Sequence, residues 1–193
     1  LLYYMLKSEL VFLEVFKGAK TQKEMAERLD ISLSTVNNAL EPLARIGAIE
    51  KRKFGLRLID REKALVFWAS TRNLEKDIVY KTRAEMSMNE IEKQMPFGVV
   101  FTAFAAFRLR FKDVPADYSE VYVYANDEAL AELKKRFPQR DGPANLIVLS
   151  KPENFFEEKI VSNELLYVDL WNLKEWYAKE FLKALRQRMG LEQ

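Results

Sequence analysis

The chemically suggestive residues of this chain are short polar side chains on one predicted helix and a cluster of basic residues that follows it. Serine, threonine and asparagine recur between residues 32 and 38, and residues 51–61 hold five basic side chains against one acid. Short hydroxyl and amide side chains can hydrogen-bond base edges and phosphates, and lysine and arginine bind phosphates. The pattern therefore favours contact with nucleic acid over covalent catalysis.

Many catalytic mechanisms are excluded, because the chain contains neither cysteine nor histidine. That absence excludes disulfides, thiolate nucleophiles, imidazole bases and any zinc site that depends on Cys or His. We accordingly predict no cofactor and no metal site. The lack of cysteine beside many lysines, glutamates and arginines also fits the cytoplasm of a heat-adapted prokaryote.

Positive charge is concentrated in the first part of the chain. Residues 1–72 hold 13 Lys and Arg against 9 Asp and Glu, whereas residues 73–193 hold 18 against 20. The chain has no run of eighteen apolar residues, so we expect a cytoplasmic protein with no membrane partner. Its opening apolar stretch is too short for a signal peptide, and a start at Leu1 suggests that further residues precede it.

Apolar spacing predicts how the helix over residues 33–46 is oriented. At about 100° per residue, apolar side chains at three- and four-residue steps share one face and should be buried. That predicted buried face comprises Leu33, Val36, Leu40, Leu43 and Ile46. The outward residues that should contact DNA, with Asn37 at the margin, are then Ser34, Thr35, Asn38 and Arg45. Ser32 is predicted to cap the helix beside them, and Pro42 to kink its last turns.

Two helices before this segment and a hairpin after it complete the first domain. Residues 8–17 form a helix pattern that Gly18 ends, and Thr21 with Glu24 forms a capping box before a second helix. Residues 48–52 and 56–59 are predicted to be two short strands around a turn. The hairpin should follow the phosphate backbone with four basic residues: Lys51, Arg52, Lys53 and Arg57.

The order of helix, capped helix, polar-faced helix and basic hairpin resembles the winged helix-turn-helix regulators of bacteria and archaea. The runs Thr21–Val36 and Leu43–Lys51 carry this resemblance, which covers about a third of the chain. It implies binding to double-stranded DNA and a role in transcription regulation. Winged helices also serve as protein-docking modules, so an interaction module without a nucleic-acid partner is an open alternative.

The remainder of the chain is predicted to be a mixed α/β domain. Strand patterns cover Ile78–Tyr80, Glu120–Tyr124 and Asn145–Leu149. Helix patterns cover Ser87–Met95, Thr102–Arg110, Asp127–Phe137 and Leu173–Met189. The fold class is therefore α+β, with a winged helix-turn-helix at residues 1–60, a linking helix at 61–75 and an α/β regulatory domain at 76–193.

The closing run Val161–Trp171, which contains Leu166-Tyr167-Val168-Asp169-Leu170, suggests a second family. It resembles the end of the abortive-infection type IV antitoxins (AbiEi-like regulators), where a Leu-Tyr-x-Asp-Leu run precedes a final helix. The resemblance implies a nucleotidyltransferase-like domain, a role as antitoxin-like autorepressor and a toxin-like protein partner. A homodimer is a further open alternative.

At the positions that bind triphosphate and metal in active nucleotidyltransferases, this chain has different residue types. Such enzymes hold triphosphate with a Gly-Ser turn and bind two Mg²⁺ ions with an Asp-x-Asp strand, whose carboxylates share one face. The turn position here is Phe101-Thr102-Ala103, and the strand position Glu120-Val121-Tyr122 has one carboxylate. We therefore predict no catalytic residues; a nucleotidyltransferase acting on nucleic acid is the alternative.

Overall fold

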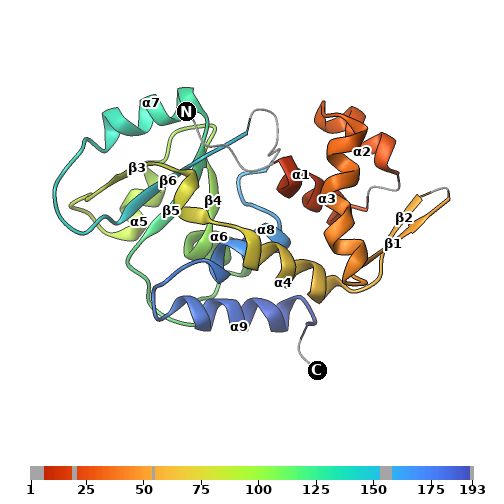
Figure 1. The fold of residues 1–193 in the computed structure, drawn as a ribbon. Coiled ribbons are helices and arrows are strands. Elements are labelled where there is room, and N and C mark those ends of the chain that lie inside the picture. Colours follow the sequence, from red (N-terminus) through yellow and green to blue (C-terminus); the bar gives the residue numbers. More distant parts are fainter. Residues whose placement is uncertain (1–6, 19–20, 54, 153–157, 192–193) are drawn as a thin grey trace. The chain divides into compact units, whose positions relative to one another are not determined.

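The computed structural model describes residues 7–18, 21–53, 55–152 and 158–191 and contains both helices and strands, so the α+β class is confirmed (Figure 1). The chain divides into two compact units, Met5–Arg72 and Asn73–Gln193. The helix predicted to link the domains over residues 61–75 ends at Thr71 and belongs to the first unit.

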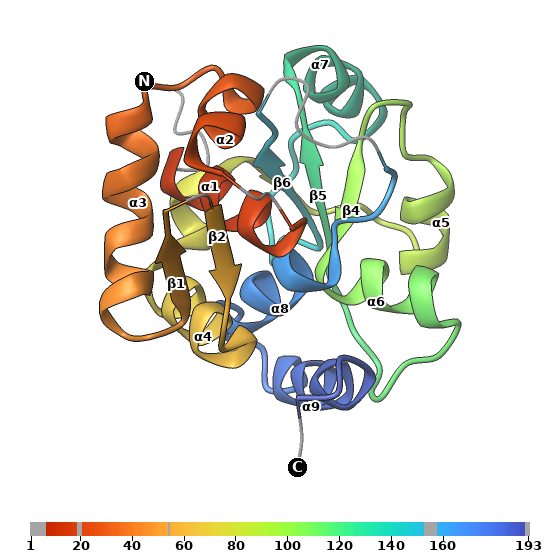
Figure 2. The same ribbon diagram turned by 90° about the vertical axis from the view of Figure 1, so that its right-hand side faces the viewer.

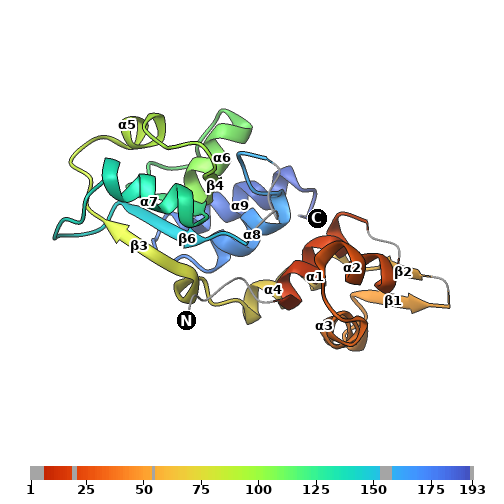
Figure 3. The same cartoon turned by 90° about the horizontal axis from the view of Figure 1, so that it is seen from above.

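The first unit consists of helices and one short hairpin. In chain order its elements are α1 (Lys7–Phe16), α2 (Gln22–Leu29), α3 (Leu33–Arg45), β1 (Ile49–Arg52), β2 (Gly55–Leu58) and α4 (Arg61–Thr71). Figure 3 shows the hairpin extending beyond the helices of this unit. The residue at the centre of the predicted turn, Phe54, lies outside the described residues.

Side-chain caps start α2 and α3 where the sequence predicts them. Thr21 Oγ1 accepts a hydrogen bond of 3.1 Å from the Glu24 amide, and Ser32 Oγ accepts one of 3.1 Å from the Thr35 amide. These bonds satisfy amides that the first turn of a helix leaves without intrahelical partners. Between the two helices Asp30 adopts a left-handed conformation with φ 50°, which lets α3 follow α2 after a short turn.

The core of the first unit lies between α1, α2, α3 and α4. Val36, Leu40 and Leu43 of α3 are buried as predicted, and Ala39 is buried beside them. The prediction was wrong for Leu33 and Ile46, which are 54% and 37% exposed. Periodicity predicts the direction in which a side chain points but not whether another element covers it. Leu33 and Ile46 lie at the two ends of α3, where the neighbouring helices leave them partly uncovered.

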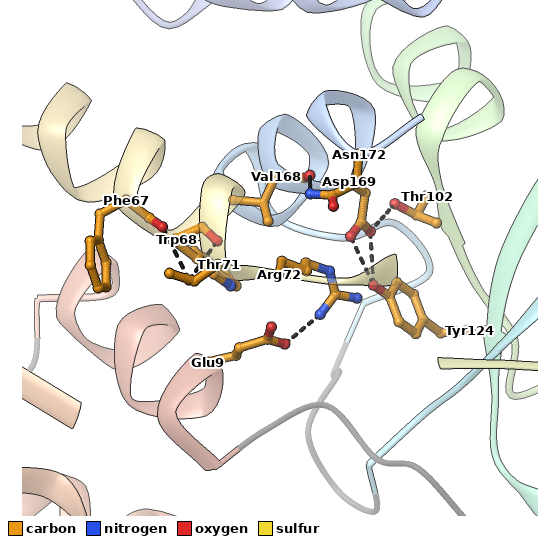
Figure 4. A network of polar contacts seen from close by, with 10 residues as sticks. All are labelled: Glu9, Phe67, Trp68, Thr71, Arg72, Thr102, Tyr124, Val168, Asp169 and Asn172. Atoms are coloured by element: carbon orange, nitrogen blue, oxygen red, sulfur yellow. Dashed lines mark hydrogen bonds and ion pairs between the residues drawn. The ribbon is translucent and has the colours of Figure 1, made fainter. Parts of the chain in front are cut away.

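A buried ion pair also lies within the first unit. The Arg72 guanidinium donates to the Glu9 carboxylate, and both residues are at most 5% exposed (Figure 4). Nearby on α4, the Thr71 hydroxyl donates to the backbone carbonyls of Phe67 and Trp68. The pair joins the C-terminal end of α4 to α1.

The second unit is an α/β unit built around one sheet. Its elements are a 3₁₀ turn (Leu74–Asp77), β3 (Ile78–Thr82), α5 (Met88–Lys93), β4 (Val100–Thr102), α6 (Ala103–Phe111), β5 (Val121–Ala125), α7 (Asp127–Arg136), β6 (Leu146–Ser150), α8 (Asn163–Trp171) and α9 (Ala178–Arg188). The strand order is β3-β6-β5-β4, with β5 and β6 parallel and the outer strands antiparallel to their neighbours.

Aromatic side chains hold helices α6 and α9 of the second unit together. Phe181 of α9 packs against Phe104 and Phe107 of α6, with ring centroids 4.9 and 5.3 Å apart. These rings are buried, as the predicted core requires. In Figure 2 the helices α6, α8 and α9 gather on one side of the unit.

The predicted elements of the second unit need three corrections. The predicted helix over residues 173–189 begins only at Ala178. The short strand β4 was not predicted, since three residues give too little pattern. The apolar run before Trp171 forms helix α8, which is buried from Leu165 to Leu170 and therefore shows no amphipathic period.

Candidate nucleic-acid interface

Half of the residues predicted to contact DNA lie on α3, and most of these are on its outward side. Ser34, Asn37, Asn38 and Arg45 are exposed, whereas Thr35 is half-buried. Since the side chains at positions i and i+4 of a helix lie one above the other, Ser34 and Asn38 form one exposed row. Exposed Leu33 and Asn37 form the row beside it.

Three hydroxyl groups at the start of α3 bind one another. Ser32 Oγ lies 2.9 Å from Ser34 Oγ and 2.8 Å from Thr35 Oγ1. The same Ser32 oxygen accepts the Thr35 amide, so it organises the whole first turn. The predicted contact residues Ser32, Ser34 and Thr35 are thus brought together, with their hydroxyl groups partly engaged within the protein.

Lysine 51 connects the hairpin to α3. Its Nζ donates to Asn37 Oδ1 at 3.0 Å and to Glu41 Oε2 at 2.7 Å. The Lys51 side chain is 25% exposed and that of Glu41 is 68% exposed. Lys51 therefore holds β1 against α3 rather than pointing out to solvent, and the hairpin lies beside the helix in Figures 1 and 2.

Strand alternation explains why Lys51 differs from its basic neighbours. In the antiparallel register Glu50 faces Arg57, and Lys51 faces Leu56. Successive side chains of a strand point to opposite faces, so Lys51 shares a face with buried Ile49. Arg52 and Arg57 lie on the other face, where both are exposed.

The exposed face of the hairpin is basic but contains one acid. Arg52 Nη2 lies 2.7 Å from Glu50 Oε2, and Arg57 is the cross-strand neighbour of that glutamate. Lys53 is exposed in the turn between the strands. Over residues 33–58 five basic side chains stand against two acidic ones, so the net charge of α3 and the hairpin is positive.

The contact between Lys51 and Glu41 also affects the pKa of the glutamate. The hydrogen bond from Lys51 lowers the pKa of Glu41 below its ordinary value, and the lysine charge adds to the effect. The Glu41 carboxylate therefore stays charged to lower pH than an ordinary glutamate, and its negative charge lies on the side of α3 that faces the hairpin. That acid opposes phosphate binding by Lys51.

In the second unit, the predicted phosphate-turn position is closed by backbone pairing. The Phe101 amide donates to the Lys159 carbonyl at 2.8 Å, and the Phe101 carbonyl accepts the Val161 amide at 3.1 Å. Ala103 follows with φ 51°, a conformation that L-residues rarely adopt and glycine adopts readily. The turn therefore has a left-handed residue, but the Phe101 amide is occupied within the protein.

The predicted metal-strand position holds two glutamate–tyrosine pairs. Tyr177 donates to Glu120, and Tyr122 donates to Glu175 Oε1 at 2.9 Å. Burial raises the pKa of Glu120, and Glu175 raises it further. Burial, followed by the hydrogen bond to Glu120, raises the pKa of Tyr177 to about 12. Glu175, which was not among the predicted site residues, thus supplies a second carboxylate near Glu120.

A buried carboxylate lies against the same two strands, β4 and β5, and belongs to the run that suggested the antitoxins. Asp169 of α8 is fully buried, and it accepts hydrogen bonds from Thr102 Oγ1 at 2.6 Å and from Tyr124 Oη at 2.8 Å (Figure 4). Asn172 Nδ2, at the end of α8, donates to the Val168 carbonyl one turn earlier. Asp169 therefore joins α8 to β4 and β5, a structural role that its sequence pattern does not reveal.

The other acids near these positions lie in two separate elements. Asp127 and Glu128 lie in the first turn of α7, and Asp113 and Asp117 lie in the exposed connection after α6. In the described part of the chain, no group of three or more acidic side chains is placed to hold a metal ion. None of the helices in the described ranges is long and apolar enough to cross a membrane.

Comparison with known proteins adds no relative: no family model, no curated protein and no solved structure matches the chain. The functional argument therefore depends on the geometry of the two units themselves.

Proposed function

We propose that the chain is a DNA-binding transcriptional regulator whose first unit is a winged helix-turn-helix. In this proposal α2 and α3 form the helix-turn-helix, and the β1–β2 hairpin is the wing. The observation that carries the proposal is the exposed polar side of α3 beside a basic hairpin, with Lys51 joining the two.

Binding would combine base contacts from α3 with phosphate contacts from the wing. The major groove of B-DNA is about 12 Å wide and admits an α-helix, whose exposed side chains can then reach base edges. Ser34 and Asn38 form the exposed row suited to that role. Arg52, Lys53 and Arg57 would bind phosphates, which fixes the orientation of the protein on the duplex without selecting a sequence.

For the second unit we propose a nucleotidyltransferase-like arrangement without nucleotidyl transfer, serving regulation or assembly. Two observations support this proposal. The Phe101 amide is hydrogen-bonded to the Lys159 carbonyl, and Tyr122 stands where a metal-binding strand needs its second carboxylate. An antitoxin-like autorepressor with a toxin-like partner is the specific form that the sequence resemblance suggests. Calorimetry with Mg²⁺ and each nucleoside triphosphate should show no saturable binding; micromolar binding that Glu120→Ala abolishes would favour an enzyme.

The salt dependence of DNA binding tests the proposed wing. We would titrate the full chain into a fluorescently labelled duplex at several salt concentrations and compare it with a variant in which Arg52, Lys53 and Arg57 are alanine. Log K falls as log salt rises, and each lost phosphate contact should make this slope shallower by about 0.9.

A control variant carries alanine at three exposed lysines of the second unit, Lys112, Lys135 and Lys179. It removes the same charge from the chain and should leave the slope unchanged. Equal slopes for the wild type and the wing variant, or equal losses in both variants, would refute the wing assignment.

A further inference from the structure

The exposed leucine at the start of α3 is not explained by packing. Leu33 is 54% exposed, whereas the apolar residues that follow it on the helix, Val36 and Leu40, are fully buried. Transfer of apolar surface out of water is favourable, so a leucine that stays exposed gains little within the unit. Its surroundings indicate what such a surface could contact.

The polar groups around Leu33 are largely bound to one another. The hydroxyl groups of Ser32, Ser34 and Thr35 form a single hydrogen-bonded group, and Asn37, one turn later, accepts the Lys51 ammonium. The first turn of α3 therefore presents an apolar surface in the row directly beside Ser34 and Asn38. In the DNA major groove, the C5-methyl group of thymine is the apolar feature that distinguishes one base from the others.

From this arrangement we infer that Leu33 contacts a thymine methyl group and selects thymine at one position of the DNA site. The inference rests on the proposed DNA-binding function. Residues at the N-terminal end of a recognition helix are the ones that reach base edges, and Leu33 is the first residue of α3. Burying one methyl group against the leucine should strengthen binding about fourfold.

The test begins with a site selected by the protein itself. Duplexes randomised over about two helical turns, roughly 21 base pairs, are selected for binding to the full wild-type chain. Each thymine of the selected duplex is then replaced by uracil, which keeps the hydrogen-bonding groups and removes only the methyl group. Affinities are measured for the wild type, Leu33→Ala, Leu33→Met and the control Ile59→Ala, whose parent residue is similarly exposed at 51%.

We expect one thymine-to-uracil replacement to weaken wild-type binding about fourfold. Leu33→Ala should bind both duplexes equally, whereas Leu33→Met and Ile59→Ala should keep the preference. Unchanged melting of Leu33→Ala would confirm that it is folded.

Two results would overturn the inference in different ways. The first is that the wild type selects a defined site in which no thymine-to-uracil replacement changes its affinity, or that Leu33→Ala still prefers thymine over uracil. Either observation refutes the role of Leu33 but leaves the proposed DNA-binding function standing. Failure of the wild type to bind any duplex refutes the proposed function, and the inference with it.

Discussion

Replacing Glu41 by glutamine should strengthen DNA binding, and the reason lies in the contact between the hairpin and α3. Lys51 Nζ is 2.7 Å from Glu41 Oε2 and 3.0 Å from Asn37 Oδ1, so its charge is balanced before DNA arrives. Glutamine keeps the size and hydrogen-bonding capacity of the side chain but removes the charge. The lysine should then become available to a phosphate while the hairpin stays in place.

The expected magnitude follows from counterion release. One additional phosphate contact steepens the slope of log K against log salt by about 0.9. An exposed ion pair contributes little to stability, so its loss should raise affinity at a fixed salt concentration only about two- to fourfold. Lys51→Ala should change the slope little in the wild type, because Glu41 already neutralises the lysine, and by about 0.9 in the Glu41→Gln background.

Fluorescence anisotropy with a duplex of arbitrary sequence, between about 50 and 200 mM salt, measures these slopes. Glu75→Gln is the matched control, since Glu75 also accepts a hydrogen bond from a lysine, Lys174, but lies in the second unit. It changes the net charge equally and should leave the slope unchanged. The argument is refuted if Lys51→Ala lowers the slope equally in both backgrounds, or if Glu41→Gln weakens binding.

Three further predictions concern single residues. Asn38→Ala should weaken binding to the selected DNA site by about 1–3 kcal/mol and barely affect random DNA, as competition titrations would show. Val36→Ala should lower the free energy of unfolding by about 2 kcal/mol in urea titrations, because this fully buried side chain leaves a cavity, and should affect specificity less. Because the pKa of Glu120 is raised in the folded state, the wild type binds more protons folded than unfolded, and stability falls as pH rises from the ordinary glutamate pKa through the folded value. Glu120→Gln should lose less stability over that interval, and equal pH profiles in urea unfolding would contradict the raised pKa.

Local signals in the sequence were sufficient for most of the first unit. Caps depend on contacts within three residues, so Thr21 and Ser32 could be assigned from the sequence. Leu33 was wrongly predicted to be buried because Ala39 was left out of the predicted buried face. Ala39 is buried, and including it moves the centre of the buried face of α3 away from Leu33. The contact of Lys51 with α3 could have been predicted, because side chains alternate along a strand and those of Lys51 and Arg52 therefore point to opposite faces of the hairpin.

The second unit was harder to predict because its decisive contacts join distant parts of the chain. Asp169 binds Thr102 and Tyr124, 67 and 45 residues away, and no local pattern reports such contacts. Helix α8 is buried on nearly all sides, so the amphipathic period that identifies surface helices is missing. Pairing of Phe101 with residues 159–161 depends on the sheet topology in the same way.

Amide hydrogen exchange of the full chain, with and without the selected duplex, tests the central proposal most directly. If α3 and the hairpin bind DNA, peptides that cover Leu33–Arg45 and Ile49–Leu58 should become protected when the duplex is added. Peptides from α7 and β6 should exchange at the same rate in both samples. Protection of the second unit alone, or none at α3 and the hairpin under conditions where the duplex is bound, would contradict the account.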